Sequence, residues 1–340
     1  MIKEAIQTLS RLNNLTAEEA EKVLDEIMTN QANDFDKSAF LMGLATKGAT
    51  IEEITGSASS LRKHALQITP NYPVLEIVGT GGDQSNTFNI STTAAIVVAA
   101  TGLIPVAKHG NRAATSKSGA ADVLEALGVD LMVSPEQSLQ SLKNNGIYFL
   151  FAQKYHQAMK FVAPVRKSLP ITTIFNYLGP LANPAGAQYQ VLGVSDEKLV
   201  EPMAHVLDQL GVVKAIVVHG DDGLDEVTLT AKTNFVKLDN HHFTKGSINP
   251  EKLGFSICKP TDLVGGTPTD NAQITQAILN GEKGPKRDVV VLNAAVALHL
   301  VKSELSLQEA IQIVKETIDS GMAKAKLFDF IKTTNDGAEK

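Results

Sequence analysis

The chain has 340 residues, of which 43% are hydrophobic and 20% are charged. This length predicts about two domains, and this composition excludes a wholly disordered chain. The net charge of −6 argues against a dedicated nucleic-acid-binding protein, which normally carries a basic surplus. A single cysteine, Cys258, excludes a scaffold built on intrachain disulfides, and the longest apolar stretch, residues 94–107, is too short to span a membrane. We therefore expect a cytoplasmic globular protein with neither membrane nor nucleic-acid partners.

Residues 1–70 show helical patterns only. Apolar residues recur at helical spacing from Ile2 to Leu12. Thr16 with Glu19, and Thr50 with Glu53, have the spacing of a capping box, in which two side chains cap the first turn of a helix. The segment predicts a small helical domain that ends near residue 70. Four prolines between residues 164 and 187 predict a helical segment that returns to this domain.

From residue 71 onwards, short apolar runs alternate with helical patterns. This alternation predicts an α/β domain over residues 71–340, with a central, mostly parallel sheet covered by helices. The expected strands are residues 74–78, 104–107, 147–151, 190–194 and 215–219, and the expected helices include residues 91–101, 119–127 and one opened by Ser134–Pro135. Residues 228–238, with a turn at Asp239–Asn240, predict antiparallel strands at the periphery.

Two segments after the first expected strand have the features of a phosphate site. Gly79 to Asp83 reads GTGGD, and such glycines let backbone N–H groups approach an anion. Taken alone, this segment is better explained as an ordinary turn, because it matches neither a dinucleotide fingerprint nor a P-loop. Asn89 to Thr92 then opens an expected helix, where a hydroxyl normally caps the helix and where an anion can also bind. Two such segments after one strand favour phosphate.

Two further loops add cations and carboxylates. Lys108 to Ser116 combines Lys, His and Arg with amide and hydroxyl side chains, which suits a polyphosphate better than a merely solvated basic loop. Loops after the strands of such a sheet are also where ligands bind. Asp221 to Glu226, DDGLDE, follows the expected strand 215–219. Its adjacent carboxylates are either a polar turn or oxygen ligands for Mg²⁺.

The segments GTGGD, NIST, KHGNRA, SGAADVLEALG, NYLGPLANPAGA and DGLDE occur in this order along the chain. Together they resemble the anthranilate phosphoribosyltransferase family, and the resemblance covers essentially the whole chain. It implies a small helical domain beside a larger α/β domain, a homodimer, and a role in tryptophan biosynthesis. The implied reaction transfers the phosphoribosyl group of 5-phosphoribosyl 1-pyrophosphate to the amine of anthranilate and releases pyrophosphate.

The resemblance also implies roles for individual residues. It implies that Lys108 to Ser116 form a mobile loop over the donor. The implied ligands of 5-phosphoribosyl 1-pyrophosphate are Gly79, Gly82, Asp83, Thr87, Asn89, Ile90, Ser91, Thr92, Lys108, His109, Gly110, Asn111, Arg112, Ala113, Ala114, Thr115 and Ser116. Gly79, Asn111 and Arg166 would hold anthranilate, and Ser91, Asp225 and Glu226 would hold two Mg²⁺ ions. No residue is assigned as a general base. The family often has a donor-contacting serine where this chain has Ala120, so Ala120 is not counted as a ligand.

Two alternatives remain open at this point. A pyrimidine or thymidine nucleoside phosphorylase shares the fold class, but its related motif usually has glycine where this chain has Asn111, and the NPAGA segment is not expected there. A catalytically silent, nucleic-acid-binding relative is disfavoured by the net charge of −6 and the intact DGLDE segment.

Overall fold

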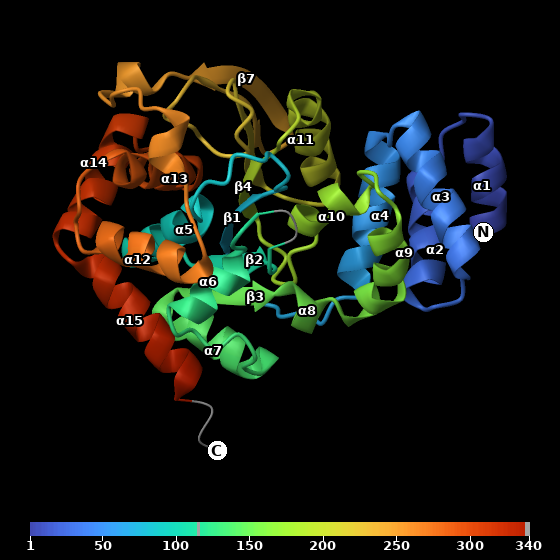
Figure 1. Cartoon of the computed structure of the whole chain (residues 1–340), viewed down its shortest axis with the longest axis horizontal. Coiled ribbons are helices and arrows are strands. Elements are labelled where there is room, and N and C mark those ends of the chain that lie inside the picture. Colours follow the sequence, from blue (N-terminus) through green and yellow to red (C-terminus); the bar gives the residue numbers. More distant parts are fainter. Residues whose placement is uncertain (114–115, 337–340) are drawn as a thin grey trace.

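The computed structural model describes residues 1–113 and 116–336, and its first four helices form a bundle. The bundle helices are α1 (Ile2–Ser10), α2 (Ala17–Met28), α3 (Asp34–Lys47) and α4 (Ile51–Lys63). Both predicted capping boxes are confirmed: Thr16 Oγ1 accepts from the Glu19 N–H at 3.2 Å, and Thr50 Oγ1 accepts from the Glu53 N–H at 3.3 Å. The bundle lies to one side of the sheet, at the right of Figure 1.

Within the described residues, seven strands form one sheet in the order β3-β2-β1-β4-β5-β6-β7. The strands are β1 (Leu75–Gly79), β2 (Val106–Gly110), β3 (Ile147–Phe151), β4 (Tyr189–Gly193), β5 (Lys214–Gly220), β6 (Thr233–Asp239) and β7 (His242–Ile248). The strands from β3 to β5 in this order are parallel, and β6 and β7 add antiparallel pairs at one edge. The prediction of a mostly parallel sheet is confirmed.

Two predicted strand boundaries were wrong. Strand β2 begins at Val106 and continues through Lys108 and His109 to Gly110, so the first part of the predicted basic loop is strand. Strand β6 begins at Thr233 rather than at residue 228. The hairpin turn consists of Asn240 and His241, both with positive φ of 48° and 68°. Two successive residues of this kind form the turn whose twist matches that of the flanking strands.

Helices cover both faces of the sheet (Figure 1). In chain order they are α5 (Ile90–Ala100), α6 (Ala120–Ala126), α7 (Pro135–Asn145), α8 (Ala152–Tyr155), α9 (Ala163–Ser168), α10 (Phe175–Leu181), α11 (Val200–Gln209), α12 (Pro268–Leu279), α13 (Pro285–Val301), α14 (Leu307–Asp319) and α15 (Met322–Asn335). Short 3₁₀ turns lie at Gln157–Phe161, Glu197–Leu199, Pro250–Leu253 and Pro260–Leu263. None of the described helices is long and apolar enough to cross a membrane.

Successive side chains of a strand point to opposite faces of the sheet, so each face has its own apolar core. Leu75 and Ile77 of β1 face the core that contains α5 and α13. Leu192 and Val194 belong to the core of the opposite face, which also contains the bundle helices. This second core includes apolar side chains of α9 and α10, such as Phe175. The proline-rich segment therefore packs against the bundle.

The order of strands places a ligand-binding edge at the centre of the sheet. The chain passes from β1 outward to β2 and β3, and then returns to β4 on the other side of β1. Gly79 and Gly193 are paired at the carboxyl ends of β1 and β4. In open α/β sheets, ligands bind outside the carboxyl ends of the strands at such a reversal.

Candidate functional site

The glycine loop after β1 is shaped around Asp225, which follows β5. A Cβ on Gly79 would lie 2.4 Å from Asp225 Oδ2, and a Cβ on Gly193 would lie 1.6 Å from the Asp225 backbone oxygen. The Gly81 N–H donates to Asp225 Oδ2 at 2.6 Å. Gly82 is exposed and has a φ of +84°, a conformation that favours glycine. The loop therefore ties a buried carboxylate to backbone donors at the edge of the sheet.

Three carboxylates converge in this part of the site. Asp225 is 8% exposed, and Asp83 lies beside it. Burial, and then repulsion from Asp83, raises the pKa of Asp225; burial, and then repulsion from Asp225, raises the pKa of Glu226. Glu226 Oε1 accepts from the Ser91 N–H at 3.1 Å, which brings the predicted metal ligands Ser91, Asp225 and Glu226 together. Like charges this close are stabilised by a cation.

The donor set suits Mg²⁺ only in part. Mg²⁺ prefers octahedral oxygen coordination by one or two carboxylates, water and substrate phosphates, rather than a complete protein cage. In residues 1–113 and 116–336, no group of three or more His, Cys, Asp or Glu side chains is arranged to hold a metal by itself. Asp225, Glu226 and the Ser91 hydroxyl therefore fit a cation that also takes oxygen ligands from a bound phosphate.

The start of α5 is held in place by residues from distant parts of the chain. Asn89 Nδ2 donates to the Ser118 backbone oxygen at 3.0 Å, and Asn89 Oδ1 accepts from Asn271 Nδ2 at 2.8 Å. Asn89 makes no side-chain cap bond to α5, so the expected capping at Asn89–Thr92 is absent. Ile90 and Thr92 are buried, and Thr87 forms an isolated bridge with Val264. Of the predicted ligands here, Ser91 is the one joined to the carboxylates.

Lys108 connects β2 to the start of α5. Its side chain is buried, and Nζ donates to the Ile77 backbone oxygen at 2.6 Å and to Ser91 Oγ at 3.3 Å. Burial lowers the pKa of Lys108, while the nearby Glu226, Glu76 and Asp225 oppose that shift. The ammonium group thus lies beside the acidic cluster, where an anionic substrate would bring a further negative charge.

His109 and His156 form a buried pair behind the site. Their ring centroids are 4.9 Å apart, and neither Nε2 has a hydrogen-bond partner in the described part of the chain. Burial lowers the pKa of His156 to about 4, and burial followed by repulsion from His156 lowers that of His109 well below its usual value. Both shifts favour the neutral imidazole in the folded protein.

This pair predicts a loss of stability in acid. Between pH 6.5 and about 4 the unfolded chain binds protons that the folded His156 excludes, so the free energy of unfolding falls as the pH decreases through this range. A shift of this size corresponds to roughly 3 kcal/mol for His156. Urea unfolding of the native protein and of His156→Gln at pH 7 and pH 4.5 measures this loss. The variant should lose less stability, and an equal loss in both proteins would contradict the assignment.

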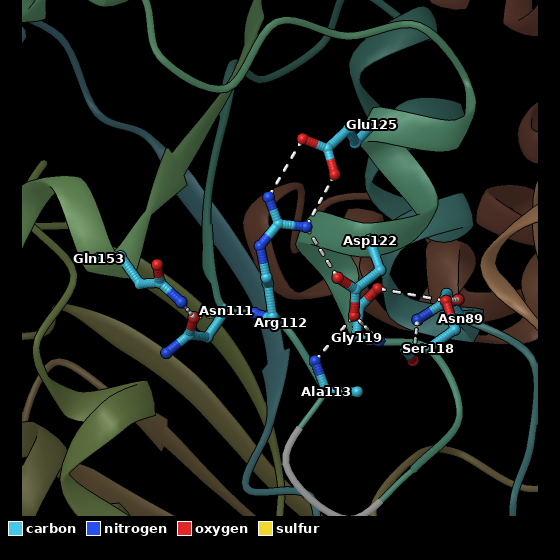
Figure 2. A network of polar contacts seen from close by, with 9 residues as sticks. All are labelled: Asn89, Asn111, Arg112, Ala113, Ser118, Gly119, Asp122, Glu125 and Gln153. Carbon is cyan, nitrogen blue, oxygen red and sulfur yellow. Dashed lines mark hydrogen bonds and ion pairs between the residues drawn. The ribbon is translucent and has the colours of Figure 1, made fainter. Parts of the chain in front are cut away.

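The loop after β2 is fastened to α6 by Arg112, as Figure 2 shows. Its guanidinium is paired with Glu125 at 2.7 Å and with Asp122 at 3.0 Å. Asp122 Oδ2 also accepts from the Ala113 N–H at 2.8 Å. On the other side of the loop, Asn111 Oδ1 lies 3.5 Å from Gln153 Nε2. In this structure the Arg112 charge is neutralised by the protein itself.

The remaining predicted residues of this loop differ in position. Gly110 ends β2, with Ala120 beside it, since a Cβ on Gly110 would lie 3.1 Å from the Ala120 Cβ. Ser116 is exposed, and its hydroxyl donates weakly to the Ser118 backbone oxygen at 3.4 Å. Ala114 and Thr115, also predicted donor ligands, lie outside the described residues.

Arg166 is a desolvated cation on α9. Its guanidinium lies 5.1 Å from the Phe175 ring centroid, and burial lowers its pKa. In the described part of the chain its side chain forms no ion pair, whereas the neighbouring Lys167 is exposed. A half-buried charge without a counter-ion loses part of its solvation, which makes Arg166 suitable for an anionic ligand.

Sequence reasoning missed several residues that shape this site. Asn271 holds Asn89 from a position 182 residues away, and Gly193 makes room for the Asp225 backbone. Glu76 is buried on β1 among otherwise apolar residues. A carboxylate inside an apolar strand was the one available signal, because a charge there requires a partner.

Two family models match the chain. The model described as "Glycosyl transferase family, helical bundle domain" matches residues 3–65, and "Glycosyl transferase family, a/b domain" matches residues 71–324. The anthranilate phosphoribosyltransferase of Lacticaseibacillus casei (strain BL23) is 56% identical over 96% of this chain and 96% of its own length.

Solved structures give the same result. Anthranilate phosphoribosyltransferase from Thermus thermophilus has a TM-score of 0.92 at 38% identity, covering 97% of this chain and 99% of its own. The enzyme from Saccharomyces cerevisiae in complex with 5-phosphoribosyl 1-pyrophosphate and Mg has a TM-score of 0.91 at 29% identity, covering 98% of each chain. The same yeast enzyme in complex with 4-fluoroanthranilate has a TM-score of 0.89 at 27% identity, covering 99% of each chain.

Proposed function

The chain belongs to the anthranilate phosphoribosyltransferase family, and we propose that it transfers the phosphoribosyl group of 5-phosphoribosyl 1-pyrophosphate to the amine of anthranilate. The products are N-(5-phosphoribosyl)anthranilate and pyrophosphate, in tryptophan biosynthesis. The observation that carries the proposal is the convergence of Ser91, Lys108, Asp225 and Glu226 at the carboxyl ends of the central strands. These groups provide hydroxyl, ammonium and carboxylate functions where a pyrophosphate is to be held.

Displacement at the ribose C1 develops positive charge on the sugar and negative charge on the leaving pyrophosphate. In our proposal, backbone N–H groups of the loop Gly79–Asp83 and the N-terminus of α5 hold the pyrophosphate. Lys108, already oriented by the Ile77 carbonyl and Ser91, adds a positive charge on the same side. Donors that are held before the reaction stabilise developing charge without reorganising.

The same site would hold Mg²⁺ through Asp225, Glu226 and the Ser91 hydroxyl. When bound, Mg²⁺ neutralises charge on the phosphate oxygens of the substrate. Two ions are our proposal for this chain, because Asp225, Glu226 and the nearby Asp83 bring three carboxylates beside the single ammonium group of Lys108.

The acceptor needs positioning more than activation. The amine of anthranilate is weakly basic, so no strong base has to deprotonate it before attack, and we assign no general base. Arg166, whose guanidinium forms no ion pair within residues 1–113 and 116–336, would bind the anthranilate carboxylate. Asn111 and the backbone at Gly79 would complete the acceptor side. Holding two substrates in reactive geometry supplies a large part of catalysis by itself.

The assay follows the loss of anthranilate fluorescence in the presence of 5-phosphoribosyl 1-pyrophosphate and Mg²⁺. The proposal expects this loss only when donor and Mg²⁺ are both present. Phosphorolysis of thymidine without any reaction of anthranilate would instead support the nucleoside phosphorylase alternative. Retention on nucleic acid without turnover would support the silent relative.

We also propose a cytoplasmic homodimer. In support of the dimer, α3 exposes two apolar side chains on one face, Phe35 at 89% and Met42 at 48%. Their spacing of seven residues places both on the same side of the helix. Light scattering should give the mass of a dimer for the native protein and of a monomer for Phe35→Glu; a dimer of unchanged stability in the variant would place the interface elsewhere. The single cysteine, Cys258, suits a reducing compartment.

We further propose residues 1–70, with the returning segment near 164–187, as one domain and residues 71–340 as the other. The two family models, which match residues 3–65 and 71–324 separately, support this division. Brief proteolysis should cut near residue 70 before it cuts within either core.

A further inference from the structure

Strands β1 and β2 are neighbours in the sheet but separate soon after they begin. Their register pairs Leu75 with Val106 and continues no further, whereas β1 and β4 are paired along all five residues of β1. Backbone groups of the two strands that face each other beyond this pair therefore need other partners. Because β2 carries Lys108 and leads into the loop over the site, the way in which this gap is held sets the position of functional groups.

Side-chain hydrogen bonds replace the backbone hydrogen bonds that β1 and β2 lack beyond Leu75 and Val106. The Glu76 Oε1 atom accepts from the His109 N–H at 3.1 Å. In the opposite direction, Lys108 Nζ donates to the Ile77 backbone oxygen at 2.6 Å. Asn183 Nδ2 donates to the Ala107 backbone oxygen at 2.8 Å. The carboxylate of Glu76 is thus the part of β1 that holds the backbone of β2 immediately after Lys108.

Packing alone does not explain a carboxylate at this place. Glu76 is completely buried, and its other oxygen, Oε2, has no partner in the described part of the chain. Burial raises the pKa of Glu76, and Asn183, Lys108, the His109 N–H and Arg62 oppose that rise. An apolar residue of similar size would pack at lower energetic cost, so the structural role of this side chain is the bond that its oxygen accepts.

We propose that Glu76 is a positioning residue for the phosphoribosyl donor: its Oε1 holds the His109 backbone and thereby fixes Lys108 against the donor site. This inference rests on the proposed function for the identity of the donor. This role requires a side chain as long as that of Glu76 with an acceptor oxygen at its end. It does not require a negative charge.

Three substitutions separate these requirements. Glu76→Gln keeps an acceptor oxygen at the same reach and should leave the KM for 5-phosphoribosyl 1-pyrophosphate within about threefold of the native value. Glu76→Leu keeps the size and removes the acceptor, and it should raise the donor KM at least about tenfold while the anthranilate KM changes less than threefold. Glu76→Asp keeps the charge but shortens the reach, so the donor KM should lie between the two.

Gln190→Leu is the matched control. Gln190 is the register partner of Glu76 on β4, is equally buried, and bonds to the Pro180 backbone oxygen rather than to β2. It should leave the donor KM unchanged even if it lowers thermal stability. If Glu76→Leu fails to fold, the comparison of Glu76→Gln with Glu76→Asp tests the proposal. A greater rise in the donor KM in Glu76→Gln than in Glu76→Asp would overturn it, because the charge would then matter more than the reach of the side chain.

Hydrogen exchange without substrates keeps this inference separate from the proposed reaction. The His109 amide should exchange at least about tenfold faster in Glu76→Leu than in the native protein, and at a near-native rate in Glu76→Gln. Absence of turnover by the native protein would overturn the proposed function and leave this readout intact. Equal protection of His109 in Glu76→Leu and in the native protein would overturn the positioning role itself.

Discussion

Asp225→Asn and Glu226→Gln are each expected to lower kcat/KM at least about 100-fold, an effect typical of removing a group that stabilises developing charge. Both substitutions keep a side-chain oxygen, so the bonds from the Gly81 N–H and from the Ser91 N–H can persist while the charge is lost. The half-saturating Mg²⁺ concentration should rise together with the loss of turnover. Steady-state rates across a Mg²⁺ titration measure both quantities.

Stability distinguishes a lost ligand from a damaged fold. Burial and repulsion between like charges disfavour the ionised forms of Asp225 and Glu226, so thermal unfolding without Mg²⁺ should be unchanged or shifted upward in both variants. Asp221→Asn is the matched control, since Asp221 is exposed in the same loop and its side chain accepts a hydrogen bond from Asn234 Nδ2 at 2.8 Å. Native Mg²⁺ dependence in the first two variants, or a loss of activity in the control as well, would remove the metal assignment.

Arg166→Ala is expected to raise the KM for anthranilate by about 10- to 100-fold, as loss of a charge-assisted bidentate pair predicts. The donor KM should change little, because the donor groups lie on the strands and on α5, whereas Arg166 lies on α9. Arg166→Lys should recover only part of the loss, since an ammonium lacks the planar fork of a guanidinium. A kinetic matrix that varies both substrates measures the two KM values together.

The neighbouring residue supplies the control for this prediction. Lys167 carries the same charge on the same helix but is exposed, so Lys167→Ala should leave both KM values unchanged. Arg166→Lys keeps a cation and an alkyl chain beside the Phe175 ring, which separates packing from recognition of the carboxylate. Equal increases in both KM values, or a loss of stability without a kinetic change, would return Arg166 to a structural role.

Local sequence patterns predict much of this fold. Several confirmed predictions depend on neighbouring residues only. They are the capping boxes at Thr16 and Thr50, the helix opened by Ser134–Pro135, and the buried strand at residues 147–151. The alternation of strands and helices after residue 71 likewise predicted a mostly parallel sheet, because a helix is the usual crossover connection between parallel strands. The motifs of the glycine and acidic loops indicated the family, which the comparisons confirm.

Tertiary structure decided what those patterns leave open. No local rule separates Lys108 in a strand from Lys108 in a loop; its assignment depends on pairing with β3, far along the chain. The partnership of Arg112 with Glu125 and Asp122 competes with the phosphate role that its motif indicates, and it exists because α6 folds back over the loop. Glu76 acquires its partner only where β1 and β2 separate. Such contacts join residues that are distant in sequence. They form only when folding brings distant segments together, so local sequence patterns do not identify the partners.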